Sequence, residues 1–522
     1  MRPLFAPWLA LLMSCGGPSP APTPTPTPAP APASNPPVQG QIAPETPDAV
    51  EPAVFTLPAS ETPIVALRLL FRSGFADDPP DAAGLTALAG DLIAQGGTRS
   101  RTAFELREAL FPWAVSIDVQ VDADMTVFTA SVHRDHLEAF LPVLAEVLTA
   151  PAWAPAEFER LRRDAIDDVE KRLRTSDDEN LGKEALSHLI YGAHPYGRFA
   201  GGSVAGLKGM TLEAVKAHAA RSFSRARLTI GVAGGWPAEL PERLKSALAG
   251  LPAGSPGPAL PSVEGSSTRV LIVEKEAPAV ALSLGAPVEF GRADPDFAAL
   301  MVGISAFGEH RQFHGRLMQR MREARGLNYG DYAYAEHFSQ DTSSTFADVN
   351  IGRRQQDFSI WVRPVQPGDA LFALRLALHE YDTLLRDGLT EAEVKRAGQF
   401  LEGYTRLWAK NPQRRLGMAL DDVFSGTPDR LEKFRAALPG LNAAVVNAAL
   451  RKHLPPPAQL KIAIVTSKAA AFRDALVADR PSPKTYDSEK PKALVAEDLA
   501  VSTRPFGLSA EAIRIVPADQ LF

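Results

Sequence analysis

Strands and helices are predicted in the same order in two parts of the chain. Residues 62–71 and 277–284 are runs of β-branched and aliphatic residues, and each precedes a turn with Asp and Pro and then an apolar segment of helical length. Further strands are predicted over 125–132 and 358–362, each followed by a helix, over 137–148 and 371–385. Another helix begins near Pro155 in the first part and near Thr390 in the second, where Thr390 and Glu393 have capping-box spacing.

This repeated order predicts an α+β protein of two tandem similar domains, each a largely antiparallel sheet with helices packed on one face. Residues 250–268 are rich in Pro, Gly and Ser and predict a linker between the domains. The predicted domains are then 49–249 and 269–480, and a polar tail over 481–522 contains one further strand candidate at 513–516.

The N-terminus has the pattern of a secretory signal peptide. Arg2 precedes an apolar run over 4–13, and Leu12-Met13-Ser14-Cys15 resembles the lipobox of bacterial lipoproteins. We expect a signal peptide over 1–14 and a lipidated Cys15, and the alternative is an ordinary signal peptide with a chance cysteine. Gly16 after the cysteine favours the outer membrane, facing the periplasm. Residues 15–48 would be the lipidated end and a stalk, because ten of the twenty residues from 18 to 37 are proline.

The composition is that of a globular protein and excludes several classes of function. Of 522 residues, 45% are hydrophobic and 22% charged, and the net charge of −6 gives no support for nucleic-acid binding. The single cysteine excludes an internal disulfide, a Cys-based zinc site and an iron–sulfur cluster. Beyond the first residues no apolar run reaches the length of about 20 that spans a membrane.

Two segments carry a resemblance to a known family. Gly84-Leu85 opens a predicted helix that ends near Gly96-Gly97-Thr98, and the second half contains Arg322-Glu-Ala-Arg-Gly-Leu-Asn-Tyr329. Together with the turn His194-Pro-Tyr-Gly197 and the two-part plan, these motifs resemble the insulinase/pitrilysin-like metallopeptidases, the inverted zincins with an H-x-x-E-H motif. The resemblance covers roughly residues 50–480 and implies the two-domain fold and peptide substrates.

The zinc-binding motif of that family is not present at its place in this sequence. Ala87, Gly90 and Asp91 stand where the family has His, Glu and His, and the downstream glutamate ligand falls near Asp167 and Asp168. A catalytic zinc needs three protein ligands and a general base, and neither Ala nor Gly offers a donor atom. We therefore expect no metal cofactor in this chain.

Other candidate sites in the sequence are weaker. His133 and His136 have i,i+3 spacing, and His310 and His314 have i,i+4 spacing, but no third ligand can be assigned to either pair. Solvated or packing histidines are the alternative. The sequence also contains no Gly-x-Ser-x-Gly elbow.

Arg322 and Tyr329 match the Arg/Tyr pair with which the family binds the substrate backbone and stabilises the developing oxyanion. The alternative is that Arg322 is one more charge in a cationic run and Tyr329 a core residue. The resemblance implies a non-metal subunit that supplies this pair in trans to a partner with an intact H-x-x-E-H motif, and zinc is expected in that partner. Two alternatives remain: a non-catalytic scaffold or binding protein with the same fold, and an active metallopeptidase with rearranged ligands.

Overall fold

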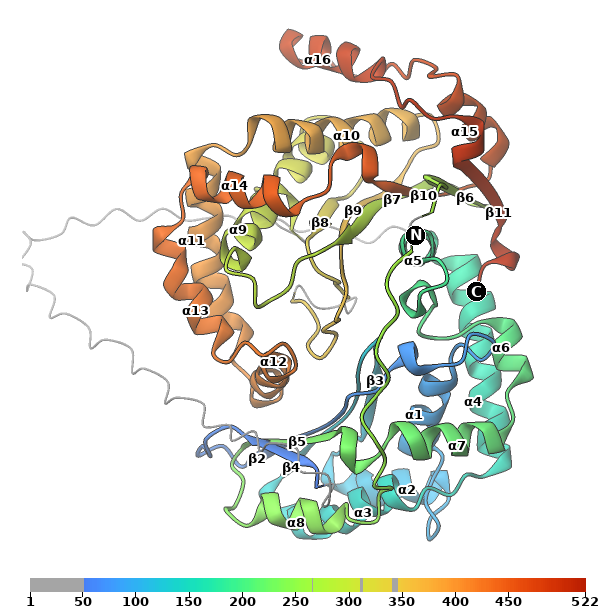
Figure 1. Cartoon of the computed structure of the whole chain (residues 1–522), viewed down its shortest axis with the longest axis vertical. Helices are drawn as coiled ribbons and strands as arrows, with labels where there is room; N and C mark the ends of the chain where they lie inside the picture. Colours follow the sequence, from blue (N-terminus) through green and yellow to red (C-terminus); the bar gives the residue numbers. More distant parts are fainter. Residues whose placement is uncertain (1–50, 265, 310–312, 340–345) are drawn as a thin grey trace, which may run out of the picture. The chain divides into compact units, whose positions relative to one another are not determined.

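The computed structural model describes residues 51–264, 266–309, 313–339 and 346–522 (Figure 1). The predicted signal peptide, Cys15, the predicted stalk and His310 lie outside the described residues. Within the described ranges, no helix combines the length and the apolar character needed to cross a bilayer. Below, the N-terminal half denotes residues 51–249 and the C-terminal half residues 269–522.

The N-terminal half is built on a five-stranded sheet in the order β1-β5-β2-β4-β3, antiparallel except for the β1–β5 pair. Helices α1, α3 and α7 and the strands β2, β4 and β5 contribute to one apolar core. The elements are β1 (Ala53–Thr56), β2 (Ile64–Phe71), α1 (Leu85–Gln95), α2 (Ala103–Leu110), β3 (Asp118–Val121), β4 (Thr126–His133), α3 (Leu137–Thr149), α4 (Pro155–Asp167), α5 (Asp178–Tyr191), α6 (Val204–Gly209), α7 (Leu212–Ser222), β5 (Leu228–Gly234) and α8 (Leu240–Ala247).

The C-terminal half repeats this plan on a six-stranded sheet in the order β11-β6-β10-β7-β9-β8. β11 and β10 lie parallel to β6, and the remaining pairs are antiparallel. The elements are β6 (Val270–Glu274), β7 (Val280–Val288), α9 (Phe297–Gly308), β8 (Asp331–Tyr334), β9 (Gln356–Val365), α10 (Ala370–Asp387), α11 (Glu391–Trp408), α12 (Pro412–Phe424), α13 (Arg430–Ala437), α14 (Ala443–His453), β10 (Lys461–Thr466), α15 (Ala469–Val477), α16 (Lys492–Ser502) and β11 (Ile513–Pro517).

The predicted strands and helices are present in both halves, with small shifts at their ends. The first strand of each repeat is β2 or β7, and the helix that follows the Asp/Pro turn is α1 or α9. Thr390 caps α11, and the side chains of Thr390 and Glu393 form the expected capping box. The candidate strand at 513–516 forms β11, which joins the second sheet as its outermost strand beside β6.

The second face of each sheet is covered by a helix from the other half, which the sequence did not predict. α5, from the N-terminal half, packs against β6, β7 and β10 through Leu181, Leu186 and Leu189. α12, from the C-terminal half, packs against β2 and β5 through Leu416 and Leu420. Each sheet is therefore buried on both faces, and neither half completes its core alone.

Candidate functional site

α1 carries the positions where the family places its zinc motif. The helix begins after Gly84, whose φ of 97° is in the left-handed region, and a Cβ there would lie 2.7 Å from the Gly202 Cα. The carboxylate of Asp78 accepts hydrogen bonds from the backbone N–H groups of Gly84, Leu85 and Thr86, which fixes the first turn. The Gly-Leu motif is thus a requirement of backbone geometry at the start of α1.

The structure gives the motif positions no set of metal ligands. Gly90 packs against β3, where a Cβ would lie 3.1 Å from the Cγ2 of Val119. Asp91 is half-buried, accepts a hydrogen bond from Gln95, and burial raises the pKa of its carboxyl to about 6. Asp168 continues α4 as the first residue of a π-helix and forms an ion pair with Arg172. The side-chain contacts of Asp91 and Asp168 are thus to different residues.

Arg322 and Tyr329 lie together. The Arg322 guanidinium is 4.8 Å from the centre of the Tyr329 ring and 5.5 Å from that of Phe313. Tyr329 is 71% exposed, so it is not a core residue. It follows the π-helix Met318–Glu323, on the loop that leads into β8.

The other arginines of the cationic run have close carboxylate partners. Arg316 pairs with Glu393 at 2.9 Å, Arg320 with Glu380 at 2.7 Å, and the buried Arg325 with Asp498 of α16 at 2.7 Å. In the described structure, the carboxylate that contacts Arg322 is that of Glu323, 3.7 Å from the guanidinium, and the Glu323 side chain is half-exposed. Arg322 therefore differs from its neighbours, because its guanidinium rests mainly on aromatic rings.

A cavity of about 460 Å³ is lined by residues of both halves, and neither Arg322 nor Tyr329 belongs to its lining. Arg363 of β9 connects the pair to it: the Nε of Arg363 is 2.9 Å from Glu179 of α5, and its guanidinium is 5.8 Å from the Tyr329 ring centre. Lys183 stands 4.1 Å from the ring centre of Trp361 on the same wall. Val121, at the edge strand β3 and 3.7 Å from a Cβ built on Gly90, lines the cavity as well. The motif positions and the Arg/Tyr pair are thus each one side chain removed from the cavity wall, through Val121 and Arg363 respectively.

Charged side chains join the two halves around this chamber. Arg353 donates from Nε to Asp122 at 3.0 Å, and His337 Nε2 lies 3.3 Å from the same carboxylate. Burial opposes the charged form of Asp122, but Arg353 and His337 outweigh it and hold the pKa of this carboxyl well below its usual range. Arg354 pairs with Asp124 at 2.7 Å. These contacts, like that between Arg363 and Glu179, carry no sequence signal, since the partners are 184 to 231 residues apart.

Among the described residues, His133 and His136 acquire no third ligand. The rings of His133 and His136 are 6.2 Å apart, and His136 stacks on Trp113. His314 is exposed, and its predicted partner lies outside the described residues. In the described part of the chain, one group has the spacing of metal ligands: Asp294, Asp296 and His453.

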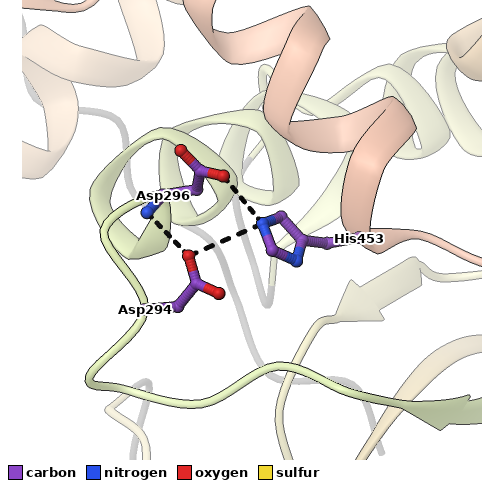
Figure 2. A group of neighbouring side chains, drawn as sticks. All are labelled: Asp294, Asp296 and His453. Atoms are coloured by element: carbon purple, nitrogen blue, oxygen red, sulfur yellow. Dashed lines mark hydrogen bonds and ion pairs between the residues drawn. The ribbon is translucent and has the colours of Figure 1, made fainter.

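That group is a structural clamp at the start of α9, as Figure 2 shows. His453 Nε2 lies 2.9 Å from Asp296 Oδ2, and the Lys452 ammonium is 2.6 Å from the same oxygen, so a cation already neutralises it. The N-terminal half contains its counterpart, where His218 of α7 faces Asp78 at 3.7 Å before α1. Burial lowers the pKa of His218 to about 4 and raises that of Asp78 to about 6. Both pairs hold a turn against a helix.

Comparison with known proteins agrees with this architecture. The model of the insulinase family, peptidase family M16, matches residues 54–198, and the model of the peptidase M16 inactive domain matches residues 209–401. The chain belongs to the insulinase-like peptidase family M16. It consists of two tandem M16 domains, the second of the inactive type.

Relatives of this M16 protein include both peptidases and non-peptidases by name. An uncharacterized zinc protease of Streptomyces coelicolor is 25% identical over 386 residues, which are 68% of this chain and 78% of that protein. The non-peptidase homolog YmxG of Helicobacter pylori is 22% identical over 369 residues, 70% of this chain and 80% of the homolog. A peptidase M16 inactive domain from Pseudomonas fluorescens has the same fold, with a TM-score of 0.68, 22% identity and coverage of 80% of this chain and 96% of that one.

Proposed function

We propose that this chain is the non-metal, substrate-binding subunit of a heterodimeric zinc metallopeptidase. The observation that carries the proposal is the contact between Arg322 and the exposed Tyr329, whose ring faces Arg363 of the chamber wall. A phenol and a planar guanidinium are suitable donors for a peptide carbonyl that becomes an oxyanion. A partner of the same family with an intact H-x-x-E-H motif would contribute the zinc and the general base.

Extended peptides are the substrate class that suits the chamber. β3 and β8 are the edge strands of the two sheets, so each has one side of its backbone unpaired within its sheet. An extended chain can add to such an edge through main-chain hydrogen bonds. Val121 at the end of β3 lines the chamber, and so does Arg363, whose guanidinium faces the Tyr329 ring.

Two other functions compete with this proposal. A scaffold or binding protein with the same fold is favoured by one observation, the relative named as a non-peptidase homolog. An active metallopeptidase with rearranged ligands is disfavoured, because Asp168 is engaged by Arg172 and Asp91 is bonded to Gln95. Elemental analysis of the dialysed chain distinguishes an active metallopeptidase from the proposed non-metal subunit. We expect no stoichiometric zinc, whereas an active metallopeptidase would retain it.

Reconstitution with the zinc-bearing partner tests the proposal. The chain alone should not cleave an unstructured fluorogenic peptide, whereas the mixture should. Tyr329→Phe keeps the ring and removes the donor, which should lower kcat of the pair by about 10²–10³. Arg322→Ala should also raise KM, because the guanidinium would hold the bound backbone before reaction.

Matched variants at other sites serve as controls. Arg386→Ala removes an exposed arginine paired with Asp387, and Tyr486→Phe removes a hydroxyl from the C-terminal tail. Both should leave kcat and KM unchanged, and gel filtration should show that all variants still pair. Wild-type kinetics from the Tyr329→Phe complex would contradict the catalytic role and favour the scaffold.

The proposed localisation is the bacterial cell envelope, where the protein would be attached to the membrane through a lipid on Cys15. Because the anchor would be the lipid alone, Cys15→Ser should move the protein from the membrane fraction to the soluble periplasmic fraction. Fractionation with a salt wash measures this, since high salt removes electrostatic attachment. A Cys15→Ser protein that stays with the membranes in high salt would contradict the lipoprotein assignment.

A further inference from the structure

The C-terminal tail contains a loop whose two ends meet on α10. Arg375 of α10 is fully buried, its Nε donates to the Arg504 carbonyl at 2.7 Å, and its Nη1 donates to the Ser482 hydroxyl at 2.8 Å. The backbone N–H of Ser482 also donates to the Ser502 carbonyl at 3.0 Å. Residues 482–504 therefore form a closed loop with its base on α10, and α16 of this loop lies beside α10 (Figure 1).

α16 is held in place mainly by polar contacts. Its buried residues are Asp498, Val501 and Ser502, so Val501 is the one fully buried apolar side chain of the helix. Val495 and Leu499 point outward and are 48% and 68% exposed. Because the helix buries little apolar surface, its hydrogen bonds and ion pairs with the rest of the C-terminal half determine where it lies.

Two carboxylates of α16 hold two arginines of the cationic run. Asp498 accepts from Nε of Arg325 at 2.7 Å, and Glu497 accepts from Nη2 of the same guanidinium at 2.8 Å. Glu497 also accepts from Arg320, whose Nε donates to Glu380 of α10 at 2.7 Å. Burial opposes the charged form of Glu497, but the hydrogen bonds from the two arginines outweigh it and hold the pKa of this carboxyl below its usual range.

The same contacts fix the backbone of the π-helix Met318–Glu323. A π-helix is rare, and the carbonyl groups at the end of any helix need donors from outside it. Arg325 donates from Nη1 to the Arg320 carbonyl at 2.9 Å, and Lys490 of the tail donates to the Ala324 carbonyl at 3.2 Å. The tail therefore supports the end of this helix directly through Lys490 and indirectly through Arg325.

Arg322 depends on this backbone for its position. Its polar contacts among the described residues are long, at 3.9 Å to the Sδ of Met318 and 3.7 Å to Glu323. Its other contacts are with the exposed rings of Phe313 and Tyr329. A cation–π contact at an exposed site is weak, so these rings do not by themselves hold the guanidinium in one place.

We propose that Glu497 and Asp498 are positioning residues for Arg322 and Tyr329. Through the two arginines that they bind, these carboxylates hold the π-helix so that the Arg322 guanidinium stays against the Tyr329 ring. The effect on turnover rests on the proposed function, whereas the effect on the position of the pair is a property of this chain alone. A loop that only stabilised the C-terminal half would lower stability without moving the pair.

Fluorine NMR of the chain labelled with 3-fluorotyrosine reports on the ring at position 329. The chain has 8 tyrosines, and Tyr329→Phe identifies the resonance by its loss. Arg322→Ala gives the resonance of the ring without its guanidinium. Asp498→Ala and Glu497→Ala should each move the wild-type resonance toward that of Arg322→Ala, because the contact is then made for only part of the time. Asp498→Asn keeps the shape of the side chain and should give a smaller shift in the same direction.

Two further variants serve as controls for the spectrum. Asp422→Ala removes a partly buried carboxylate of α12 in the same half, which pairs with Arg430 at 2.9 Å. Tyr486→Phe removes a hydrogen bond to Asp498 but keeps the ion pair of that carboxylate with Arg325. Both should leave the resonance of the ring at 329 unchanged, and circular dichroism checks that every variant is folded.

Kinetics of the reconstituted pair test the consequence for turnover. Asp498→Ala should lower kcat about 10-fold, less than Tyr329→Phe, because the donor is present but in place for about a tenth of the time. On the Tyr329→Phe background the same substitution should lower kcat less than about 3-fold, since the donor that it positions is already gone. A general loss of stability would instead act independently of Tyr329, so full additivity of the two changes would contradict the positioning role.

The spectrum and the kinetics fail separately. A resonance at 329 that stays in place in both Asp498→Ala and Glu497→Ala, or that moves as far in Asp422→Ala, would overturn the positioning role and leave the proposed function standing. A wild-type mixture without peptidase activity would contradict the proposed function instead, and the fluorine spectrum of the chain alone would still decide whether the tail holds the pair.

Discussion

Arg322 and Arg325 stand three residues apart in one motif and have opposite surroundings. Arg325 is 2% exposed, and its guanidinium holds Asp498 and Glu497 of α16. Arg322 rests on the exposed ring of Tyr329. The difference arises from the direction of the side chains. Arg325 points into the interior of the C-terminal half, whereas Arg322 lies against an exposed ring. One arginine of the motif therefore stabilises the tail, and the other is available to a substrate.

Asp331, two residues after Tyr329, is a buried carboxyl with only part of its hydrogen bonding satisfied. One oxygen accepts from Asn328 at 2.6 Å, and the other is buried without a partner in the described structure. Burial raises the pKa of Asp331 to about 8. The folded state therefore binds a proton that the unfolded state, with a pKa near 3.9, has lost at neutral pH.

We expect Asp331→Asn to flatten the pH dependence of stability. The contribution of Asp331 is fully present below about pH 4 and is lost as the pH rises toward 8, because the folded state retains the proton longer. The variant should gain several kcal/mol relative to wild type between pH 4 and pH 8, up to about 5 kcal/mol for a difference of about four pKa units, and should show little difference at pH 4. Urea unfolding across this range measures it, with Asp135→Asn, whose side chain is 73% exposed, as the control.

The helices α5 and α12 are the elements that complete the two sheets. Each is amphipathic and follows a long helix of its own half, yet each packs on the sheet of the other half. Leu416 of α12 is fully buried among Phe55, Leu70 and Met125. Because each half contributes a helix to the sheet of the other, the stability of each sheet depends on the other half.

Leu416→Ala should destabilise the N-terminal sheet although the substitution lies in the C-terminal half. Removing a buried leucine side chain costs about 2–5 kcal/mol, and the loss should appear in urea unfolding and as faster amide exchange in β2 and β5. Leu407→Ala in α11 is the matched control, because Leu407 is 41% exposed. Unchanged exchange in β2 with Leu416→Ala would contradict the reciprocal packing.

At the scale of the whole molecule, polar contacts join the two halves at several points. Arg68 of β2 donates to the side chain of Asn350 at 2.7 Å, Arg354 pairs with Asp124, and Asp122 is held by Arg353 and His337. Buried charges of this kind depend on their partners, because a single loss leaves the other charge without compensation.

Arg353→Met should therefore cost about 3–5 kcal/mol, mainly because Asp122 then remains buried with His337 alone beside it. Adding Asp122→Asn should recover a part of that loss of at least about 1 kcal/mol, since the uncompensated charge is removed. A double-mutant cycle by urea unfolding measures the coupling, and Arg386→Met at an exposed pair should have an effect close to zero. Simple additivity of the two changes would show that the pair does not hold the halves together.

Local patterns in the sequence were sufficient for most of the elements and for the family. Apolar periodicity predicted β2, β4, β7 and α3, and the Thr390–Glu393 spacing predicted a cap, because these depend on neighbours within one turn or one strand. The absence of donors at Ala87 and Gly90 is likewise a property of the residues themselves. The two-domain plan followed from the repeat of these local signals.

Tertiary structure alone decided which surfaces meet. Nothing in the sequence of α12 distinguishes packing on its own sheet from packing on the other, because an amphipathic helix fits either apolar face. The pairing of Asp122 with Arg353 and of Glu179 with Arg363 joins residues that only folding brings together. Sequence patterns show which face of a segment is apolar and can be buried, whereas long-range packing determines which other segment covers that face.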